Sequence, residues 1–127
     1  MRKIKIIIVD DKDVFRNALK IFIGKIKDFE IIAEASNGKE FLAILKNNTE
    51  VDIVLMDIIM PEMDGIEATR TALIHYPYLK IIGITTYNDP LYFYSMQNAG
   101  ACGFLNKNSV NEELENTIRT TILKKKI

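Results

Sequence analysis

Short apolar runs alternate with segments of helical periodicity from one end of the chain to the other. The apolar runs lie near residues 4–9, 30–35, 52–56, 81–84 and 102–106. The third run is almost wholly apolar, as a strand covered on both faces should be. The second is flanked by charged residues, which favours a place near a sheet edge. Strict alternation of strands and helices predicts a three-layer α/β sandwich with right-handed crossovers.

The helical segments between these strands carry start and stop signals. Apolar residues at helical spacing mark the first helix, at Phe15, Leu19, Phe22 and Ile26. Capping-box patterns predict three further helix starts, at Asn37 with Glu40, Asp64 with Glu67, and Ser109 with Glu112. The fourth helix is expected to begin at Asp89-Pro90 and to end at Gly100, because proline suits a helix start and glycine suits its end.

Four of the apolar runs end on residues suited to phosphate chemistry, namely Asp10 with Asp11, Asp57, Thr85 and Lys107. Because the carboxyl ends of parallel strands share one edge, where open α/β sheets bind ligands, we expect these side chains around one crevice. Each residue alone has an ordinary explanation, such as a helix cap for an aspartate. Their joint spacing argues against coincidence.

Three carboxylates packed together repel one another, which raises their pKa values unless a cation lies among them. Mg²⁺ suits such a place because it prefers hard oxygen ligands and keeps waters that a phosphate can displace. Lys107 can pair with a carboxylate or a phosphoryl oxygen, and Thr85 offers a hydroxyl donor. A carboxylate held among these groups is a candidate nucleophile toward an activated phosphoryl donor.

Composition narrows the class of protein. The 127 residues suffice for one domain, and 48 % of them are hydrophobic, which is typical of a globular chain. Seventeen basic residues balance seventeen acidic ones, so no net positive field favours nucleic acid or a membrane surface. The single cysteine, Cys102, is expected to be a buried and inert thiol in the fifth strand, and lysines 124–126 to be a helix end. We therefore expect a soluble, cytoplasmic protein.

The motifs at the strand ends resemble those of the response-regulator receiver domains of two-component signalling. Four segments carry the resemblance, at residues 7–11 (IIVDD), 56–65 (MDIIMPEMDG), 84–85 (IT) and 103–107 (GFLNK). It covers residues 1–127 as one receiver domain. It implies a flavodoxin-like (βα)5 fold with a parallel sheet in the order 2-1-3-4-5.

The same resemblance implies a role for each residue at the site. Asp57 would accept the phosphoryl group, and Asp11 would join it as a direct ligand of Mg²⁺. Asp10 would act on the metal through a water, and Ile59 through its backbone carbonyl. The phosphoryl oxygens would be bound by Thr85 and Lys107.

Signal output would follow from movement of Thr85 toward the phosphoryl group, which frees space for the aromatic Phe104 to turn. The phosphate would come from a sensor histidine kinase or a phosphotransfer protein, and the signalling partner could be a second copy of the phosphorylated chain. Such a domain is not an enzyme beyond its own phosphorylation and dephosphorylation. Ile59 and Tyr87 would flank the path of the water that hydrolyses the aspartyl-phosphate, and their bulk would slow this dephosphorylation.

Asn108 stands where many receivers have proline, which together with segments 85–87 and 103–105 resembles the NarL/LuxR-type subfamily. Members of this subfamily usually continue into a helix-turn-helix domain, which this sequence lacks. We therefore expect either part of a longer transcription regulator or a free-standing receiver. DNA would be bound only through a separate domain.

The main alternative is an enzyme. Asp11 and Asp13 after an apolar strand loosely match the Asp-x-Asp signature of haloacid-dehalogenase-like phosphatases, although that family normally needs a cap and gives Asp57 no role. A flavodoxin-like FMN carrier shares the expected topology, but no Ser/Thr/Gly-rich loop follows the first strand. A pure interaction module would lack a complete site.

Overall fold

Five parallel strands form one sheet at the centre of the protein. They are β1 (Ile4–Val9), β2 (Phe29–Ala35), β3 (Ile53–Asp57), β4 (Ile81–Thr85) and β5 (Gly103–Asn106). The order across the sheet is β2-β1-β3-β4-β5, so the predicted order and the edge position of the second strand are both confirmed. This arrangement comes from a computed structural model that describes residues 2–86 and 88–124.

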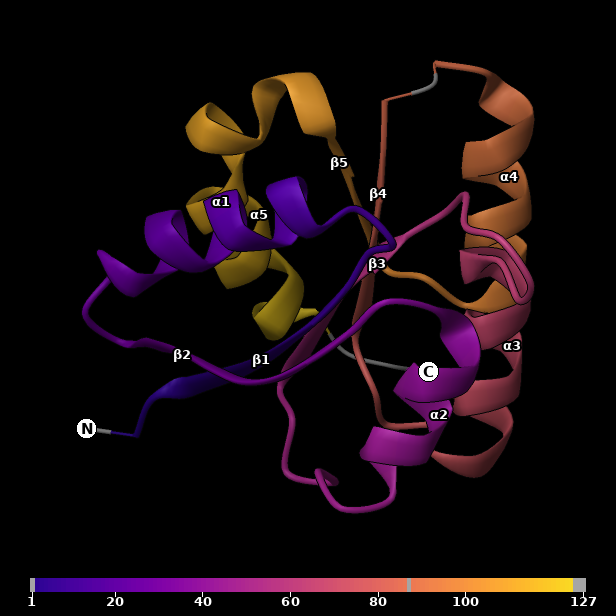
Figure 1. The fold of residues 1–127 in the computed structure, drawn as a ribbon, viewed down its shortest axis with the longest axis horizontal. Helices are drawn as coiled ribbons and strands as arrows, with labels where there is room; N and C mark the ends of the chain where they lie inside the picture. Colours follow the sequence, from indigo (N-terminus) through magenta and orange to yellow (C-terminus); the bar gives the residue numbers. More distant parts are fainter. Residues whose placement is uncertain (1, 87, 125–127) are drawn as a thin grey trace.

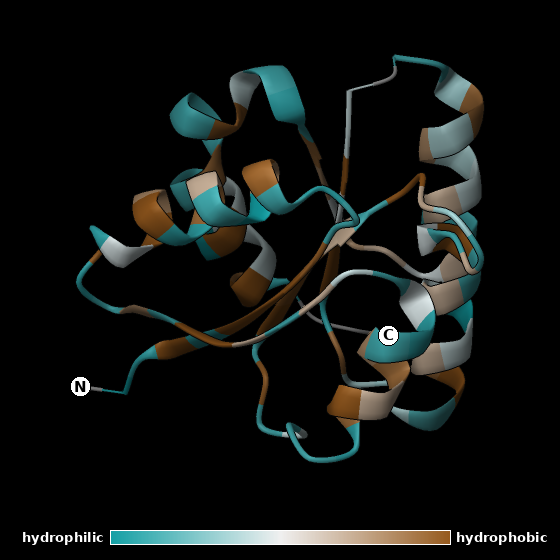
Figure 2. Cartoon of the chain, viewed as in Figure 1, coloured by the Kyte–Doolittle hydropathy of each residue, from teal (hydrophilic) through white to brown (hydrophobic). Residues whose placement is uncertain are grey.

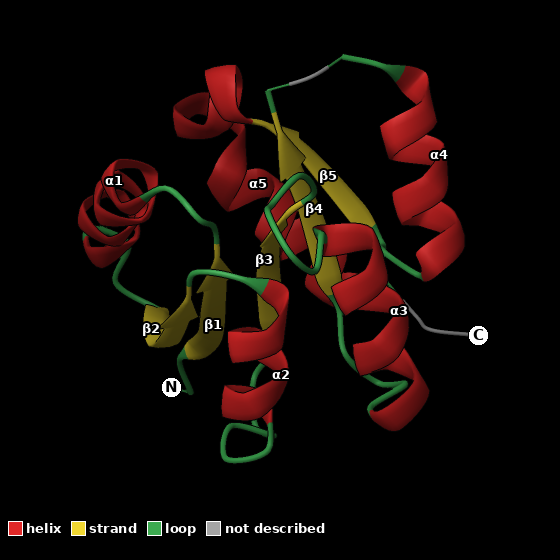
Figure 3. Cartoon of the chain, turned by 45° about the vertical axis from the view of Figure 1, so that its right-hand side comes forward, coloured by secondary structure: helices red, strands yellow, loops and turns green. Residues whose placement is uncertain are grey.

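Helices cover both faces of this sheet and complete the three layers (Figure 1). One face carries α1 (Asp13–Gly24) and α5 (Val110–Leu123). The other carries α2 (Gly38–Leu45), α3 (Gly65–His75) and α4 (Pro90–Ala99). Figure 3 shows the strands enclosed between these two sets of helices. The predicted flavodoxin-like sandwich is therefore confirmed.

Alternation along each strand divides the apolar residues between two cores. In β1, Ile6 and Ile8 pack toward α1 and α5, while Ile7 and Val9 pack toward the other three helices. All four are fully buried, each worth about 1.5–3 kcal/mol relative to an exposed position. The central strands are mostly brown in Figure 2, which reflects their burial on both faces, as expected of a parallel sheet.

Most of the predicted helix ends are confirmed. The side chain of Asn37 accepts a hydrogen bond from the Glu40 amide at 2.8 Å, and that of Asp64 accepts one from the Glu67 amide at 2.9 Å. Pro90 opens α4, and Gly100 follows its last residue in the left-handed conformation, with φ of 114°.

The helix start predicted at Ser109 is confirmed, because Ser109 directly precedes α5, but the predicted capping box does not form. A short 3-10 helix, Lys107–Ser109, joins β5 to α5, and it leaves Ser109 with φ −122° and ψ 19° rather than the extended conformation of a capping residue. The Ser109 side chain makes no capping hydrogen bond. Instead, the side chain of Asn106 accepts a hydrogen bond from the Asn108 amide at 2.8 Å.

Cys102 departs from its predicted place. It lies just before β5 and is only half-buried, with Sγ 3.9 Å from the carbonyl oxygen of Ile81. Lys124 donates from Nζ to the Cys102 carbonyl at 2.6 Å, which ties the end of α5 to this turn, whereas lysines 125 and 126 lie outside the described residues. None of the helices within the described ranges has the length and apolar character needed to cross a membrane.

The loop from β3 to α3 brings two backbone segments into contact at Gly65. Its amide donates to the Ile58 carbonyl at 2.8 Å. A Cβ atom there would lie 2.1 Å from the Asp57 carbonyl oxygen and 2.8 Å from the Ile58 Cα. Only glycine therefore allows α3 to start this close to the end of β3.

We predict that Gly65→Ala destabilises the protein by about 2 kcal/mol, because the added methyl group must push the end of β3 away from α3. Gly24→Ala is the matched control, since a Cβ at that helical position meets no atom within 4 Å. It should be neutral or stabilising by about 0.5 kcal/mol. Urea unfolding of both variants measures the difference, and equal midpoints would contradict the prediction.

Candidate functional site

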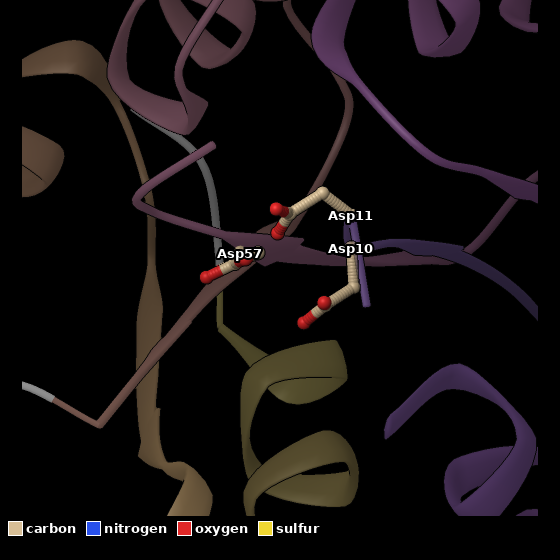
Figure 4. Close-up of side chains that lie close together, drawn as sticks. All are labelled: Asp10, Asp11 and Asp57. Carbon is tan, nitrogen blue, oxygen red and sulfur yellow. The ribbon is translucent and has the colours of Figure 1, made fainter. Parts of the chain in front are cut away.

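Three aspartates meet at the carboxyl edge of the sheet. Asp10 and Asp11 follow β1 directly, and Asp57 is the last residue of β3, the neighbouring strand. One carboxylate oxygen from each lies within 4.8 Å of the other two, an arrangement seen in Figure 4. Asp10 is 1 % exposed and Asp57 is 4 % exposed, so two of the three are buried charges. The predicted meeting of these three side chains is thus found.

One oxygen of each aspartate lacks a hydrogen-bond partner. These buried atoms are Oδ2 of Asp10, Oδ1 of Asp11 and Oδ2 of Asp57. The other oxygen of Asp10, in contrast, accepts from the Lys12 amide at 2.8 Å. Buried carboxylate oxygens are costly unless a donor or a cation compensates them. This donor set fits a hard divalent cation.

Lys107 is the fixed positive charge of this cluster. It follows β5, and its side chain is 10 % exposed. The Nζ atom lies 2.7 Å from Oδ2 of Asp10 and 3.7 Å from Oδ2 of Asp57. The contact with Asp10 is an ion pair without the directional geometry of a hydrogen bond. One ammonium group therefore faces two carboxylates at once.

Burial raises the pKa of Asp57 to about 7, and the negative charge of Asp10 adds to the effect. Lys107 acts in the opposite direction but does not cancel the shift. Without a divalent cation, the Asp57 carboxyl is therefore partly protonated at neutral pH. A protonated carboxyl is a poor nucleophile, so a cation that lowers this pKa would also make Asp57 more nucleophilic.

The remaining predicted residues lie around the same opening. Thr85 is the last residue of β4 and is 1 % exposed. A cavity of about 360 Å³ opens over Asp57 and is lined by Lys12, Phe15, Asp57, Ile59, Thr85, Thr86, Lys107 and Asn108. Ile59 thus lies where the sequence placed it, beside the phosphoacceptor candidate. Tyr87, the second residue expected to shield the site, lies outside the described residues.

Arg16 supports the site in a way that the sequence analysis missed. Its Nη1 donates to the backbone carbonyl of Asp10 at 2.5 Å, and its Nε donates to Glu34 on β2 at 2.9 Å. A further ion pair joins Arg16 to Asp13 in the first turn of α1. These bonds fix the turn that carries Asp10 and Asp11. The acidic residues near Arg16 in the sequence indicate this role only weakly. The contact of Arg16 with Glu34 forms only once β2 pairs with β1 in the folded protein.

Phe104, the predicted switch residue, is half-buried on the side of the sheet that faces α4. Its ring meets that of Phe93 edge to face, with centroids 5.5 Å apart. Two of the four large side chains at the start of α4, Tyr92 and Phe93, are half-buried. The other two, Leu91 and Tyr94, are 67 % and 63 % exposed.

Comparison with known proteins gives a consistent result. The family model of the response regulator receiver domain matches residues 6–119. The chain is 40 % identical over 113 residues to the uncharacterized transcriptional regulatory protein YhcZ of Bacillus subtilis (strain 168), covering 89 % of this chain and 52 % of that protein. It is 33 % identical over 105 residues to the transcriptional regulatory protein DegU of Brevibacillus brevis, covering 83 % and 44 %. The chain thus spans about half the length of these relatives.

Solved structures show the same fold. A two-component response regulator of the LuxR family from Aurantimonas sp. SI85-9A1 superposes with a TM-score of 0.89 at 28 % identity, covering 94 % of this chain and 85 % of that one. A chain of the CheX–CheY–BeF3–Mg²⁺ complex from Borrelia burgdorferi gives a TM-score of 0.89 at 25 % identity, covering 97 % and 92 %. These matches give no support to the phosphatase alternative.

The raised pKa of Asp57 predicts how stability depends on pH in the absence of divalent cations. Between the unfolded value of 3.8 and the folded value of about 7, the folded state binds the additional proton. Stability therefore falls as the pH rises through this window, and the loss is complete above about pH 7. Asp57→Asn removes the titrating group. It should stabilise the protein by roughly 2 kcal/mol more at pH 8 than at pH 5.

Urea unfolding in EDTA at the two pH values measures this difference. Glu30→Gln is the control, because Glu30 is an exposed carboxylate near the amino end of β2, away from the carboxyl edge that carries the site. A gain for Asp57→Asn that is the same at both pH values would contradict the prediction.

Proposed function

This chain belongs to the family of response regulator receiver domains, and we propose that Asp57 accepts a phosphoryl group in a step that requires Mg²⁺. The donor is a sensor histidine kinase or a phosphotransfer protein. One observation carries the proposal: Asp10, Asp11 and Asp57 each hold a buried carboxylate oxygen that makes no hydrogen bond, and carboxylate oxygens of all three lie within 4.8 Å of one another. Mg²⁺ would be held by Asp11 and Asp57, by Asp10 through a water, and by the backbone carbonyl of Ile59.

The transfer is a displacement at phosphorus. A carboxylate oxygen of Asp57 forms a bond to phosphorus while the bond to the donor breaks, and the donor leaves with the electron pair of that bond. Mg²⁺, when bound, supplies neutralisation of charge on the phosphoryl oxygens. Lys107 offers a second positive charge 3.7 Å from Asp57, and the Thr85 hydroxyl lies in the lining of the same cavity. We propose that both bind phosphoryl oxygens.

We place the domain over residues 1–127, within a transcription regulator that works in the cytoplasm. Two observations support this proposal. The matched relatives are transcriptional regulatory proteins of about twice this length, and a LuxR-family regulator shares the fold. DNA would then be bound by another part of the regulator, since the charges of this chain balance at seventeen of each sign. The protein is a signalling domain whose chemistry is limited to its own phosphorylation and dephosphorylation.

We predict that acetyl phosphate and Mg²⁺ add one phosphoryl group to the chain and that the group lies on Asp57. Mass spectrometry of the intact protein and of its peptides measures the addition. Asp57→Asn and added EDTA should each abolish it, while Glu30→Gln, at an exposed position near the amino end of β2, should leave it unchanged. A full mass gain in Asp57→Asn would overturn the assignment, and a label on Asp11 would instead favour the phosphatase alternative.

Signal output is proposed to run through Thr85 and Phe104. When the Thr85 hydroxyl binds the phosphoryl group, Phe104 can leave its contact with Phe93 and turn toward the vacated space. This shifts a population between two arrangements, so the phosphorylated site must favour one of them. The affected surface comprises α4, β5 and α5, where Leu91 and Tyr94 are exposed. We propose a second copy of the chain as its partner, bound through this face or through α1 and α5.

The expected result is a rise in average mass toward a dimer when beryllofluoride and Mg²⁺ are added, measured by light scattering. Thr85→Val keeps the shape of the side chain but removes the hydroxyl donor, so the same rise should need at least about threefold more protein. An unchanged monomer fraction in the wild-type chain with and without beryllofluoride would contradict this output mechanism.

A further inference from the structure

Lys107 has a third neighbour besides the two carboxylates. Its Nζ lies 4.4 Å from the centroid of the Phe15 ring, within the range of a cation–π contact. Phe15 belongs to the first turns of α1, which starts three residues after Asp10. The ring is half-buried and packs on the core formed by α1, α5 and the sheet. A residue that helical periodicity assigned only to the core thus also reaches the site.

We propose that Phe15 is a positioning residue, whose ring holds the Lys107 ammonium between Asp10 and Asp57. This inference rests on the proposed phosphorylation of Asp57. It concerns the residue that places the lysine for that reaction.

The need for such a contact follows from the lysine itself. Its side chain is a flexible stem of four methylene groups, and its ammonium can pair with the carboxylate of Asp10 or of Asp57. It lies 2.7 Å from Asp10 and 3.7 Å from Asp57, so Asp10 attracts it more strongly. A ring fixed in the core provides a further attraction that does not move with Asp10. The ammonium is thereby kept within reach of an oxygen on Asp57.

The ring has two properties that a polar neighbour would lack. It attracts the cation through its quadrupole but accepts no conventional hydrogen bond, so a donor of the ammonium stays available for a phosphoryl oxygen. It also excludes water from one side of the ammonium, and low local polarity strengthens the interactions of that charge. Phe15 and Lys107 both line the cavity over Asp57, so this effect acts where the phosphoryl group would enter.

Three variants separate this role from simple packing. Phe15→Leu keeps an apolar side chain but removes the ring, whereas Phe15→Tyr keeps the ring. Phe22→Leu is the matched control, because Phe22 lies on the same helix and packs half-buried on the same core. We expect Phe15→Leu to lower the maximal rate of labelling by acetyl phosphate about fivefold. Phe15→Tyr and Phe22→Leu should stay within about twofold of the wild type.

A second measurement tests the contact without phosphorylation. A cation above a ring face experiences the ring current, so the Lys107 Cε protons should resonate upfield in the wild type and in Phe15→Tyr. The shift should vanish in Phe15→Leu and persist in Phe22→Leu.

The inference is overturned if the wild type lacks the upfield shift, if Phe15→Leu labels at the wild-type rate, or if Phe22→Leu or Phe15→Tyr slows as much as Phe15→Leu. Equal slowing in Phe22→Leu would mean that loss of packing in this core explains the effect. Absence of labelling in the wild type, while the upfield shift is present, would overturn the proposed function and with it this role of Phe15.

Discussion

Repulsion among Asp10, Asp11 and Asp57 is the constraint to which the rest of the site responds. Three carboxylates share one small volume, two of them are buried, and each presents an oxygen without a hydrogen-bond donor. Separated in water these groups would ionise near pH 4, but here burial and Asp10 hold the pKa of Asp57 at about 7. The arrangement persists because the fold forces it. The isoleucines and leucines buried on both sides of the sheet supply the stability that offsets its cost.

The register of the sheet is what brings the charges together. Val9 of β1 pairs with Met56 of β3, so the residues that follow, Asp10 and Asp57, lie side by side at the edge of the sheet. A shift of one residue would send each side chain to the opposite face and would move Asp10 away from Asp57. Arg16 then holds the turn after β1 through the Asp10 carbonyl, and Gly65 lets α3 begin against the end of β3. The site is therefore held from both neighbouring loops.

Features that depend on local pattern or on strand direction could be predicted from the sequence. The strands, most helix caps and the convergence of Asp10, Asp11, Asp57, Thr85 and Lys107 follow from periodicity and from the common edge of parallel strands, whereas the strand order came from the resemblance to receivers. Ser109 makes no capping hydrogen bond because the chain enters a 3-10 helix directly after β5. A serine and a glutamate three residues apart in the sequence do not reveal that geometry. The contacts of Arg16 with Glu34 and of Phe15 with Lys107 join residues far apart in sequence. They depend on how α1 packs against the sheet, which no local sequence pattern encodes.

The balance of charge explains why such a site can report the presence of a phosphoryl group. Two ammonium groups face the cluster, that of Lys107 beside Asp10 and that of Lys12 at 3.5 Å from Oδ1 of Asp11. They cannot neutralise three carboxylates, so the cluster keeps a net negative charge that favours a divalent cation. With that cation bound, the cluster would no longer carry excess negative charge, and Asp57 would ionise. Under the proposed function, an acyl phosphate on Asp57 would restore negative charge at the end of β3, where Lys107 and Thr85 line the same cavity. Under that proposal, attraction between the phosphoryl group and these two side chains would draw on the ends of β4 and β5, and Phe104 lies on the second of these strands.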